Sequence, residues 1–385
     1  GAKFGPALLW MAPVTFPMMF AVVYLSAKLG QVTGRGLFAV LRKHYPRKVL
    51  LPTLAGVLIG NTIEAGADLG GIAAAAHLLV PVPIVALVPS IGVILAALQA
   101  WGSYKLMRNI FRILALALLA YVPAALLAHP DWPAVLRGTL VPTVRFDREF
   151  LSIVVAVIGT TLSAYLYTWQ SNEEVEEEKD AGRVLLSQRQ GATDTELKDS
   201  RRDVWFGMFF SNAAMYFIVL ATASTLHRTG QTDIDSAAQA AAALAPLAGD
   251  AAKALFALGV IGVGCLAVPV MTGGAAYDLC QTAGWKYGLD KRPRQAKYFF
   301  GAIAAFTAVG IGMNFVGINP MKALVFAGIV QGFSTPPLML LIMLMTNDRK
   351  IMGERRNGRP MNVLGWITTA TIFAASIALV VSWFV

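Results

Sequence analysis

The chain has 385 residues, of which 56% are hydrophobic and 14% are charged. This composition is typical of a polytopic membrane protein and excludes an ordinary soluble domain. The formal net charge is +10, but the basic residues lie in short loops between apolar segments, so they indicate membrane topology rather than nucleic-acid binding. The two cysteines, Cys265 and Cys280, are too few for a disulfide framework or a cysteine metal cluster.

Apolar segments of membrane-spanning length recur along the whole chain. About 20 consecutive apolar residues cross a bilayer as one helix, and the apolar pattern predicts ten such spans. We expect them near residues 7–29, 49–79, 81–102, 110–128, 150–171, 204–226, 252–276, 298–317, 321–346 and 362–384. The sequence therefore predicts an all-α polytopic membrane protein, with the lipid bilayer as its partner.

Basic residues gather in the loops on one side of this predicted topology. About 25 of the 32 Lys and Arg residues lie in the stretches 28–48, 105–112, 172–203, 286–297 and 349–359. The positive-inside rule makes that side cytoplasmic. Ten spans in this orientation place the first residue outside the membrane without a signal peptide. We therefore expect one further helix upstream, which would make an eleven-span protein.

The second predicted span has three polar side chains on one face. Asn61, Glu64 and Asp68 are spaced by three and four residues, so they project from the same side of a helix. Carboxylates inside a membrane are costly and usually face a cavity or a polar partner. One interpretation is that the three side chains line an ion pathway. The alternative is that they form a packing hydrogen bond to Ser, Thr or Asn on a neighbouring helix.

The fifth predicted span is interrupted near its middle. Residues 151–179 begin as an apolar helix and then read GTTLSA from Gly159 to Ala164. A glycine and three hydroxyl residues weaken a helix where lipid offers no replacement hydrogen bonds. Transporters use such breaks to coordinate ions through unwound carbonyls and hydroxyls, which makes Thr161, Ser163 and Ala164 candidate ligands. The alternative is a straight helix whose small residues pack against a neighbour.

Three further polar features have simple structural interpretations. The glutamates within 173–178 are predicted to form a solvated helix end rather than a metal site. Asp278 is expected near the cytoplasmic end of its span, where an interfacial charge needs no special role. Gln331 precedes Pro336 and Pro337, and it either packs in a kinked core or lines the pathway. The sequence contains no phosphate loop, nucleophile elbow or His-Glu-x-x-His motif, so an intramembrane enzyme would have no recognisable catalytic set.

Six segments spread along essentially the whole chain carry a family resemblance: GAKFGPALLW, SAKLGQVTGRGLFAVLRKHYPR, GADLGG, HPDWPAVLRGTLVP, GTTLSAYLYTWQSNEEVEEE and TNDRKIMG. In this order they resemble the Nramp family of divalent-metal transporters, and most closely its bacterial Nramp-related branch. The resemblance implies a leucine-transporter-like fold, with two five-helix repeats of inverted topology and the ion between the broken first and sixth helices. The family's first helix, with its Asp-Pro-Gly-Asn-type motif, is expected to be missing here.

The residues at the sixth-helix break differ from those of the family. Alignment through Gly159 puts Ser163 at the family's methionine, Ala164 at its proline and Tyr165 at its histidine. A second family histidine matches Gln170. Because these replacements remove a thioether and two imidazoles, we expect a preference for harder cations and no coupling to protons.

The third helix of the family is also altered in this chain. Asp68, in GADLGG, matches the aspartate of a Thr-Asp-Leu-Ala-Glu stretch, while the glutamate of that stretch matches Gly71. The resulting expectation is a metal site around the broken helix and an ion pathway beside it. The metal site would comprise Thr161, Ser163, Ala164 and Tyr165, and the pathway would comprise Asn61, Glu64, Asp68, Gln170 and Gln331.

The resemblance implies a divalent cation transporter of the bacterial cytoplasmic membrane that works by alternating access. Mg²⁺ and Mn²⁺ are favoured, with Fe²⁺ as a further substrate, and the metal is cargo rather than a cofactor. A single transmembrane domain is expected, with residues 1–128 as the rest of the first repeat, 150–346 as the second repeat and 362–384 as an additional span. Two alternatives stay open, namely a cation-coupled symporter of small organic solutes on the same fold and an intramembrane enzyme.

Overall fold

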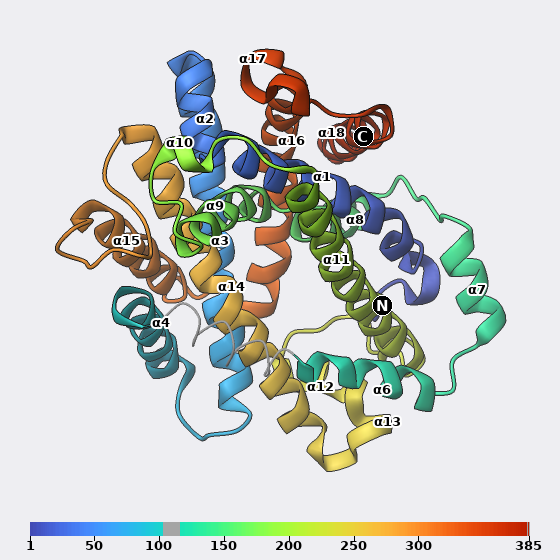
Figure 1. Ribbon diagram of the computed structural model, residues 1–385. Coiled ribbons are helices and arrows are strands. Elements are labelled where there is room, and N and C mark those ends of the chain that lie inside the picture. Colours follow the sequence, from blue (N-terminus) through green and yellow to red (C-terminus); the bar gives the residue numbers. More distant parts are fainter. Residues whose placement is uncertain (103–115, 383, 385) are drawn as a thin grey trace.

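The computed structural model describes residues 1–102, 116–382 and 384, and Figure 1 shows them as a bundle of helices. No strand occurs among the described residues. Eight helices are long and apolar enough to cross a membrane. Within a bilayer a helix satisfies all its backbone hydrogen bonds internally, which is why long apolar segments fold this way.

The long helices follow one another along the chain with short helices in the connections. The long helices are α1 (Met11–Thr33, after the 3₁₀ turn Gly5–Leu8), α3 (Arg47–His77), α4 (Ile84–Trp101), α8 (Arg148–Thr161) with α9 (Ala164–Asp180), α11 (Asp194–Thr222, extended to His227), α14 (Ala252–Ala283), α16 (Pro320–Asn347) and α18 (Arg359–Val381). The shorter helices are α2 (Leu37–His44), α6 (Tyr121–Leu127), α7 (Trp132–Leu140), α10 (Leu186–Arg189), α12 (Ala237–Ala241), α13 (Ala245–Ala248), α15 (Lys297–Met313) and α17 (Arg349–Met352).

Eight of the ten predicted spans correspond to helices of spanning length. The predicted span 298–317 forms the shorter apolar helix α15. The predicted span 110–128 is described only from residue 116, as a 3₁₀ turn followed by α6. Its first part, and the basic stretch 105–112, lie outside the described residues.

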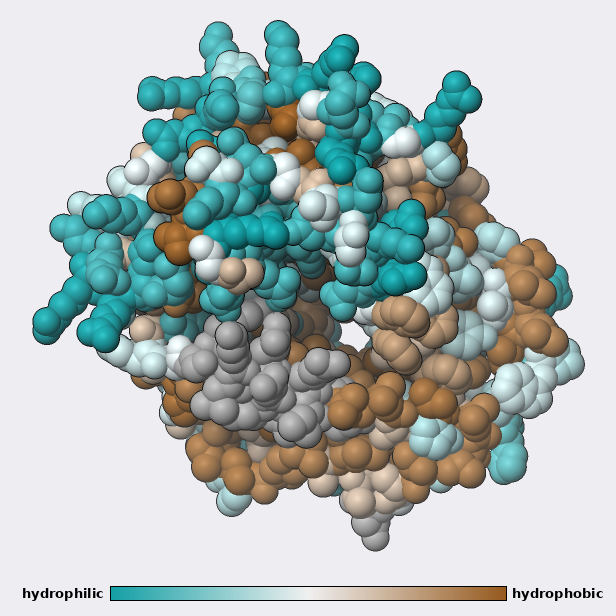
Figure 2. Space-filling view, viewed as in Figure 1, coloured by the Kyte–Doolittle hydropathy of each residue, from teal (hydrophilic) through white to brown (hydrophobic). Residues whose placement is uncertain are grey.

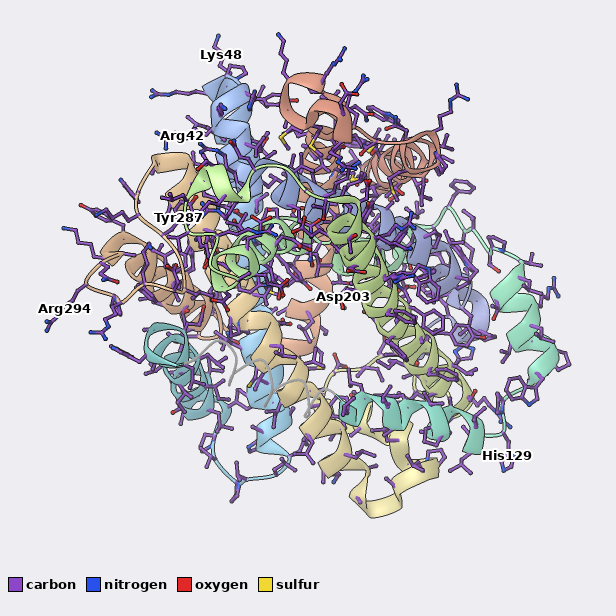
Figure 3. The ribbon with its side chains drawn as sticks, viewed as in Figure 1. Arg42, Lys48, His129, Asp203, Tyr287 and Arg294 are labelled. Carbon is purple, nitrogen blue, oxygen red and sulfur yellow. The ribbon has the colours of Figure 1, made fainter. Side chains whose placement is uncertain are left out.

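Hydrophilic side chains gather at one end of the molecule, at the top of Figure 2, where α2, α10 and α17 lie in Figure 1. Arg42 and Lys48 extend from this end and Arg294 from the left edge of the same hydrophilic region, whereas His129 lies at the opposite end (Figure 2 and Figure 3). The described basic stretches therefore come together on one side of the bundle, as the loop pattern predicted.

Helix α3 lies in the middle of the bundle, in contact with α4, α14, α15 and α16. Glycines permit the closest of these approaches. A Cβ atom on Gly66 would lie 3.1 Å from the Cα of Gly310 in α15, and one on Gly264 in α14 would overlap the side chain of Ile72. Membrane helices use small residues in this way where backbones must pack closely. The polar face of α3 is thereby held inside the protein.

Candidate metal site at a broken helix

The predicted interruption of the fifth span is confirmed. Helix α8 ends at Thr161 and α9 begins at Ala164. Between them Leu162 has φ −114° and ψ 39°, and Ser163 has the extended values φ −64° and ψ 144°. The last carbonyls of α8 and the first N–H groups of α9 therefore lose their helical partners. The alternative of a straight helix is wrong.

Hydroxyl groups satisfy several of the carbonyls at this break. The Ser163 hydroxyl donates to the carbonyl oxygens of Gly159 at 2.6 Å and of Thr160 at 3.0 Å. The Tyr167 hydroxyl donates to the Leu162 carbonyl at 2.5 Å. Ser163 is fully buried, so its side chain fixes the end of α8. The lone pairs of the Ser163 hydroxyl oxygen could also face a cation.

The break is held against α16 by glycines on both helices. A Cβ atom on Gly159 would overlap the carbonyl oxygen of Gly328 and would lie 2.5 Å from the backbone nitrogen of Gly332. A Cβ atom on Gly328 would in turn lie 2.9 Å from the Ala156 carbonyl oxygen. Because backbone meets backbone here, no side-chain rotation can make room for a larger residue at Gly159.

A methionine that the sequence did not single out lies beside the break. The Thr161 hydroxyl donates to the Met215 sulfur of α11 at 3.6 Å. Met215 is half-buried. A thioether is a soft ligand, so α11 brings one soft atom close to an otherwise oxygen-rich turn. Sequence spacing could not reveal this, because the two residues are separated by 54 positions.

The structure brings together three of the predicted pathway residues across α3 and α16. The Gln331 amide donates to the Asn61 side-chain oxygen at 3.2 Å, and the Glu64 carboxylate lies near the Gln331 amide. All three side chains are buried. Asn61 Nδ2 and Glu64 Oε2 nevertheless have no partner in the described part of the chain. The cluster thus links two helices, as the packing interpretation proposed, but it also leaves a buried donor and a buried acceptor that packing does not explain.

Asp68 of α3 and Tyr165 of α9 lie within electrostatic range of each other. Asp68 keeps accessible surface although Ala67 and Leu69 on either side of it are buried. Tyr165, in the first turn of α9, is also partly accessible and lies within electrostatic range of both Asp68 and Glu64. The carboxylates of α3 therefore lie near the first turn of α9.

Gln170 is engaged in a different polar cluster, further along α9. Its amide donates to Glu174 at 3.0 Å, and Glu174 also accepts hydrogen bonds from Gln31 of α1 at 2.7 Å and Ser200 of α11 at 3.1 Å. Glu174 is only 8% exposed. The prediction that these glutamates form a solvated helix end is therefore wrong for Glu174, because α1 and α11 close over it.

Asp278 departs most from expectation. Its side chain is completely buried, not interfacial, and neither carboxylate oxygen has a well-formed hydrogen bond in the described part of the chain. The nearest hydroxyl is that of Thr168 in α9, which is itself buried. The prediction failed because α9 covers this turn of α14, a tertiary contact that no local pattern encodes.

The break offers oxygen atoms rather than a cluster of metal-binding side chains. Among the residues that the structure describes, no three His, Cys, Asp or Glu side chains cluster as a metal cage would require. What the break supplies instead is carbonyl and hydroxyl oxygens, at the negative end of the α8 dipole.

Comparison with known proteins gives a consistent result. A family model described as "Natural resistance-associated macrophage protein-like" matches residues 1–382. A Bacillus subtilis protein named divalent metal cation transporter MntH is 25% identical over 100% of this chain and 87% of its own length. The protein of the same name from Ralstonia nicotianae is 28% identical over 99% of this chain and 85% of its own length.

Solved structures agree with the sequence comparison. The crystal structure of the Eremococcus coleocola manganese transporter in complex with an aromatic bis-isothiourea compound superposes with a TM-score of 0.69. It shares 16% sequence identity, covering 99% of this chain and 81% of the other. This likeness confirms the leucine-transporter-like fold that the resemblance implied. The chain therefore belongs to the Nramp family, and it is a membrane transporter rather than an enzyme.

Proposed function

We propose that the protein carries divalent cations across the membrane, with Mg²⁺ and Mn²⁺ as preferred substrates and Fe²⁺ as a further one. The observation that carries this proposal is the break between α8 and α9, where oxygen atoms replace the soft ligand of the family. Magnesium keeps several of its waters and prefers oxygen ligands at about 2.0–2.1 Å. The Ser163 hydroxyl oxygen, and the carbonyls from Thr161 to Ala164, are hard donors of this kind.

The carboxylates of α3 would provide the negative potential that draws a cation inward. Asp68 keeps accessible surface inside the bundle, and Glu64 has one oxygen without a partner in the described part of the chain. Both lie within electrostatic range of Tyr165 at the start of α9. In this proposal the ion meets Asp68 and Glu64 on its way to the break, and the hydrogen-bonded pair of Asn61 and Gln331 lies beside Glu64.

We further propose alternating access without proton coupling, in a bacterial cytoplasmic membrane with the basic loops on the cytoplasmic side. Tyr165 and Gln170 occupy the positions matched to the family's histidines, and Gln170 is held by Glu174. A tyrosine, with a reference pKa of about 10, is a poor proton relay near neutral pH. The two repeats, residues 1–128 and 150–346, would move against each other around the break.

Uptake of metal into liposomes that contain a metal-sensitive dye tests this proposal. Asp68→Asn should slow Mg²⁺ and Mn²⁺ uptake strongly, because it removes a charge that faces the pathway. Asp203→Asn is the matched control, since Asp203 is an exposed aspartate on α11 (Figure 3). Equal uptake by the two variants at matched protein density would refute the role of Asp68. Acidification of the lumen during metal uptake would refute uncoupled transport.

The same liposomes separate the proposal from its remaining alternative. A cation-coupled symporter of small organic solutes would need both sodium and the solute for net transport. We expect saturable metal uptake with neither present. Metal uptake that depends on an added organic solute would favour the symporter instead.

A further inference from the structure

A basic cavity opens at the hydrophilic end of the bundle, away from the break between α8 and α9. It has a volume of about 360 Å³ and is lined by the end of α1, the last turns of α9, the segment around α10 and the connection from α14 to α15. Tyr287, which lines it, is labelled in Figure 3. Ligand pockets in proteins have volumes of about 300–1,000 Å³, so this cavity can hold a small molecule or a headgroup.

The lining of this basic cavity is strongly cationic. Five of its eleven lining residues are basic and one is acidic, which leaves a positive excess. These six residues are Arg35, Lys179, Arg189, Lys286, Lys291 and Asp290. Two of the lysines are compensated, because Lys179 pairs with Glu176 at 2.7 Å and Lys291 pairs with Asp290 at 3.1 Å. Neither arginine forms an ion pair within the described ranges of the chain.

The two arginines converge on one wall of the cavity. The backbone N–H of Gly191 donates to the Val32 carbonyl at 2.9 Å, which docks the segment after α10 on the end of α1. Gly34 has φ +61°, and a Cβ atom there would lie 2.8 Å from the Cβ of Arg189. Only a glycine fits this turn without strain. The chain thus brings the residue after Gly34, which is Arg35, next to Arg189.

The Nε donors of both arginines are left unused, whereas Nη1 of Arg189 donates to the backbone carbonyl oxygens of Arg183 at 3.0 Å and of Val184. The Nε atoms of Arg35 and Arg189 are buried and have no partner in the part of the chain that the structure describes. Both guanidinium groups lie within electrostatic range of the Tyr287 hydroxyl, as does Glu176 from α9. Buried donors without acceptors are rare in folded proteins and are costly. An acceptor that could reach both arginines and Tyr287 would remove this cost.

We propose that the basic cavity binds the phosphate group of a phosphorylated ligand, held by Arg35 and Arg189 with Lys286 and Tyr287 beside them. An arginine presents a planar fork of N–H donors that matches two phosphate oxygens at once, and such charge-assisted bonds are stronger than neutral ones. The phosphate could belong to a soluble metabolite or to an anionic lipid headgroup at the cytoplasmic interface. The chemistry recognised is the same in both cases.

Phosphate binding would restrain the moving part of the transporter. The cavity joins α1 and α9 to the α14–α15 connection, and α9 is the second half of the broken helix. A ligand that ties the far end of α9 to this connection would slow any motion of α9. This consequence rests on the proposed transport function, whereas the binding itself does not.

Binding is tested first, with purified protein and no transported metal. The probes are inorganic phosphate, pyrophosphate and nanodiscs that contain phosphatidic acid or only phosphatidylcholine. We expect a saturable rise in the melting temperature with one of the phosphate probes. Arg35→Ala and Arg189→Ala should each weaken binding about tenfold or more, since each removes a charged hydrogen-bond donor. Arg35→Lys keeps the charge but loses the fork, so it should bind with intermediate affinity.

The control is Arg294→Ala, which removes a basic residue from the same α14–α15 connection. Arg294 is exposed and extends away from the bundle (Figure 3). The affinity of the Arg294→Ala variant for the probe should equal that of the wild type. The melting temperature without ligand identifies any alanine variant that misfolds. If one does, the affinity of Arg35→Lys for the probe decides the test. Response to the soluble probes assigns the site to a metabolite, and response to phosphatidic acid alone assigns it to a headgroup.

Three results would overturn the proposal. One is the absence of saturable binding by any phosphate probe at millimolar concentration. Another is an unchanged affinity in Arg35→Ala and Arg189→Ala. The third is an equal loss in Arg294→Ala, which would indicate general attraction to a basic surface. If phosphate binding is found but metal uptake is absent in every condition, the binding proposal is supported and the proposed transport function is refuted.

Discussion

The close approach of α8 and α16 beside the break gives a sharp prediction for Gly159→Ala. The added methyl group would overlap the Gly328 carbonyl oxygen and lie 2.5 Å from the Gly332 nitrogen. Overpacking of a tight site costs about 1–3 kcal/mol, and the upper end applies here because backbone atoms block the methyl group. The higher helix propensity of Ala over Gly stabilises the folded state by about 1 kcal/mol. We therefore expect a net loss of about 2 kcal/mol in the free energy of unfolding.

A matched control is Gly301→Ala in α15. A Cβ atom there would meet no other atom within 4 Å, so only the propensity gain of about 1 kcal/mol remains. The two substitutions are chemically identical and should shift stability in opposite directions.

The two buried cysteines provide the assay. Cys265 and Cys280 are both buried and free, so a thiol-reactive fluorophore labels them only as the protein unfolds. Gly159→Ala should melt at a lower temperature than the wild type and should transport metal more slowly, because the break moves away from α16. Gly301→Ala should melt at the same or a higher temperature. Equal melting curves for both variants would refute the close packing of α8 on α16.

Three further substitutions test the buried polar groups by the same melting assay. Gln331→Leu should lower the free energy of unfolding by about 1–3 kcal/mol, since the buried Asn61 side-chain oxygen loses its donor; an unchanged melting temperature would contradict the cluster. Glu174→Ala should cost about 1.5–3 kcal/mol, because it strands the Gln31 amide and other donors. Asp278→Asn should stabilise the protein by about 1 kcal/mol, since a buried carboxylate without a partner becomes a neutral amide; a clear loss of stability would mean that Asp278 has a partner or bound cation in solution.

Local features of the sequence predicted much of the site. The run from Gly159 to Ser163 weakens a helix by itself, so the break was visible without tertiary information. Helical spacing likewise put Asn61 and Glu64 on one face, and the structure places that face inside the bundle. The apolar spans were predictable for the same reason, since length and hydropathy determine them.

Features that depend on distant contacts could not be predicted in this way. Glu174 is buried because Gln31 of α1 and Ser200 of α11 close over it. Asp278 is buried because α9 covers it, although its place near the end of a span predicted exposure. Met215 reaches the break from α11. Each case needs the relative placement of two helices, which is set by glycine contacts and polar pairs across the bundle.

The preference for hard cations is tested most directly by competition between Mg²⁺, Mn²⁺ and Cd²⁺ for uptake into liposomes. The oxygen donors at the break predict that Mg²⁺ and Mn²⁺ are transported and that Cd²⁺, the softest of the three, has no advantage. Ser163→Met should shift the order toward Cd²⁺, whereas Met215→Leu should leave Mg²⁺ uptake unchanged. Cd²⁺ that outcompetes Mg²⁺ in the wild type, or an unchanged order in Ser163→Met, would contradict the account.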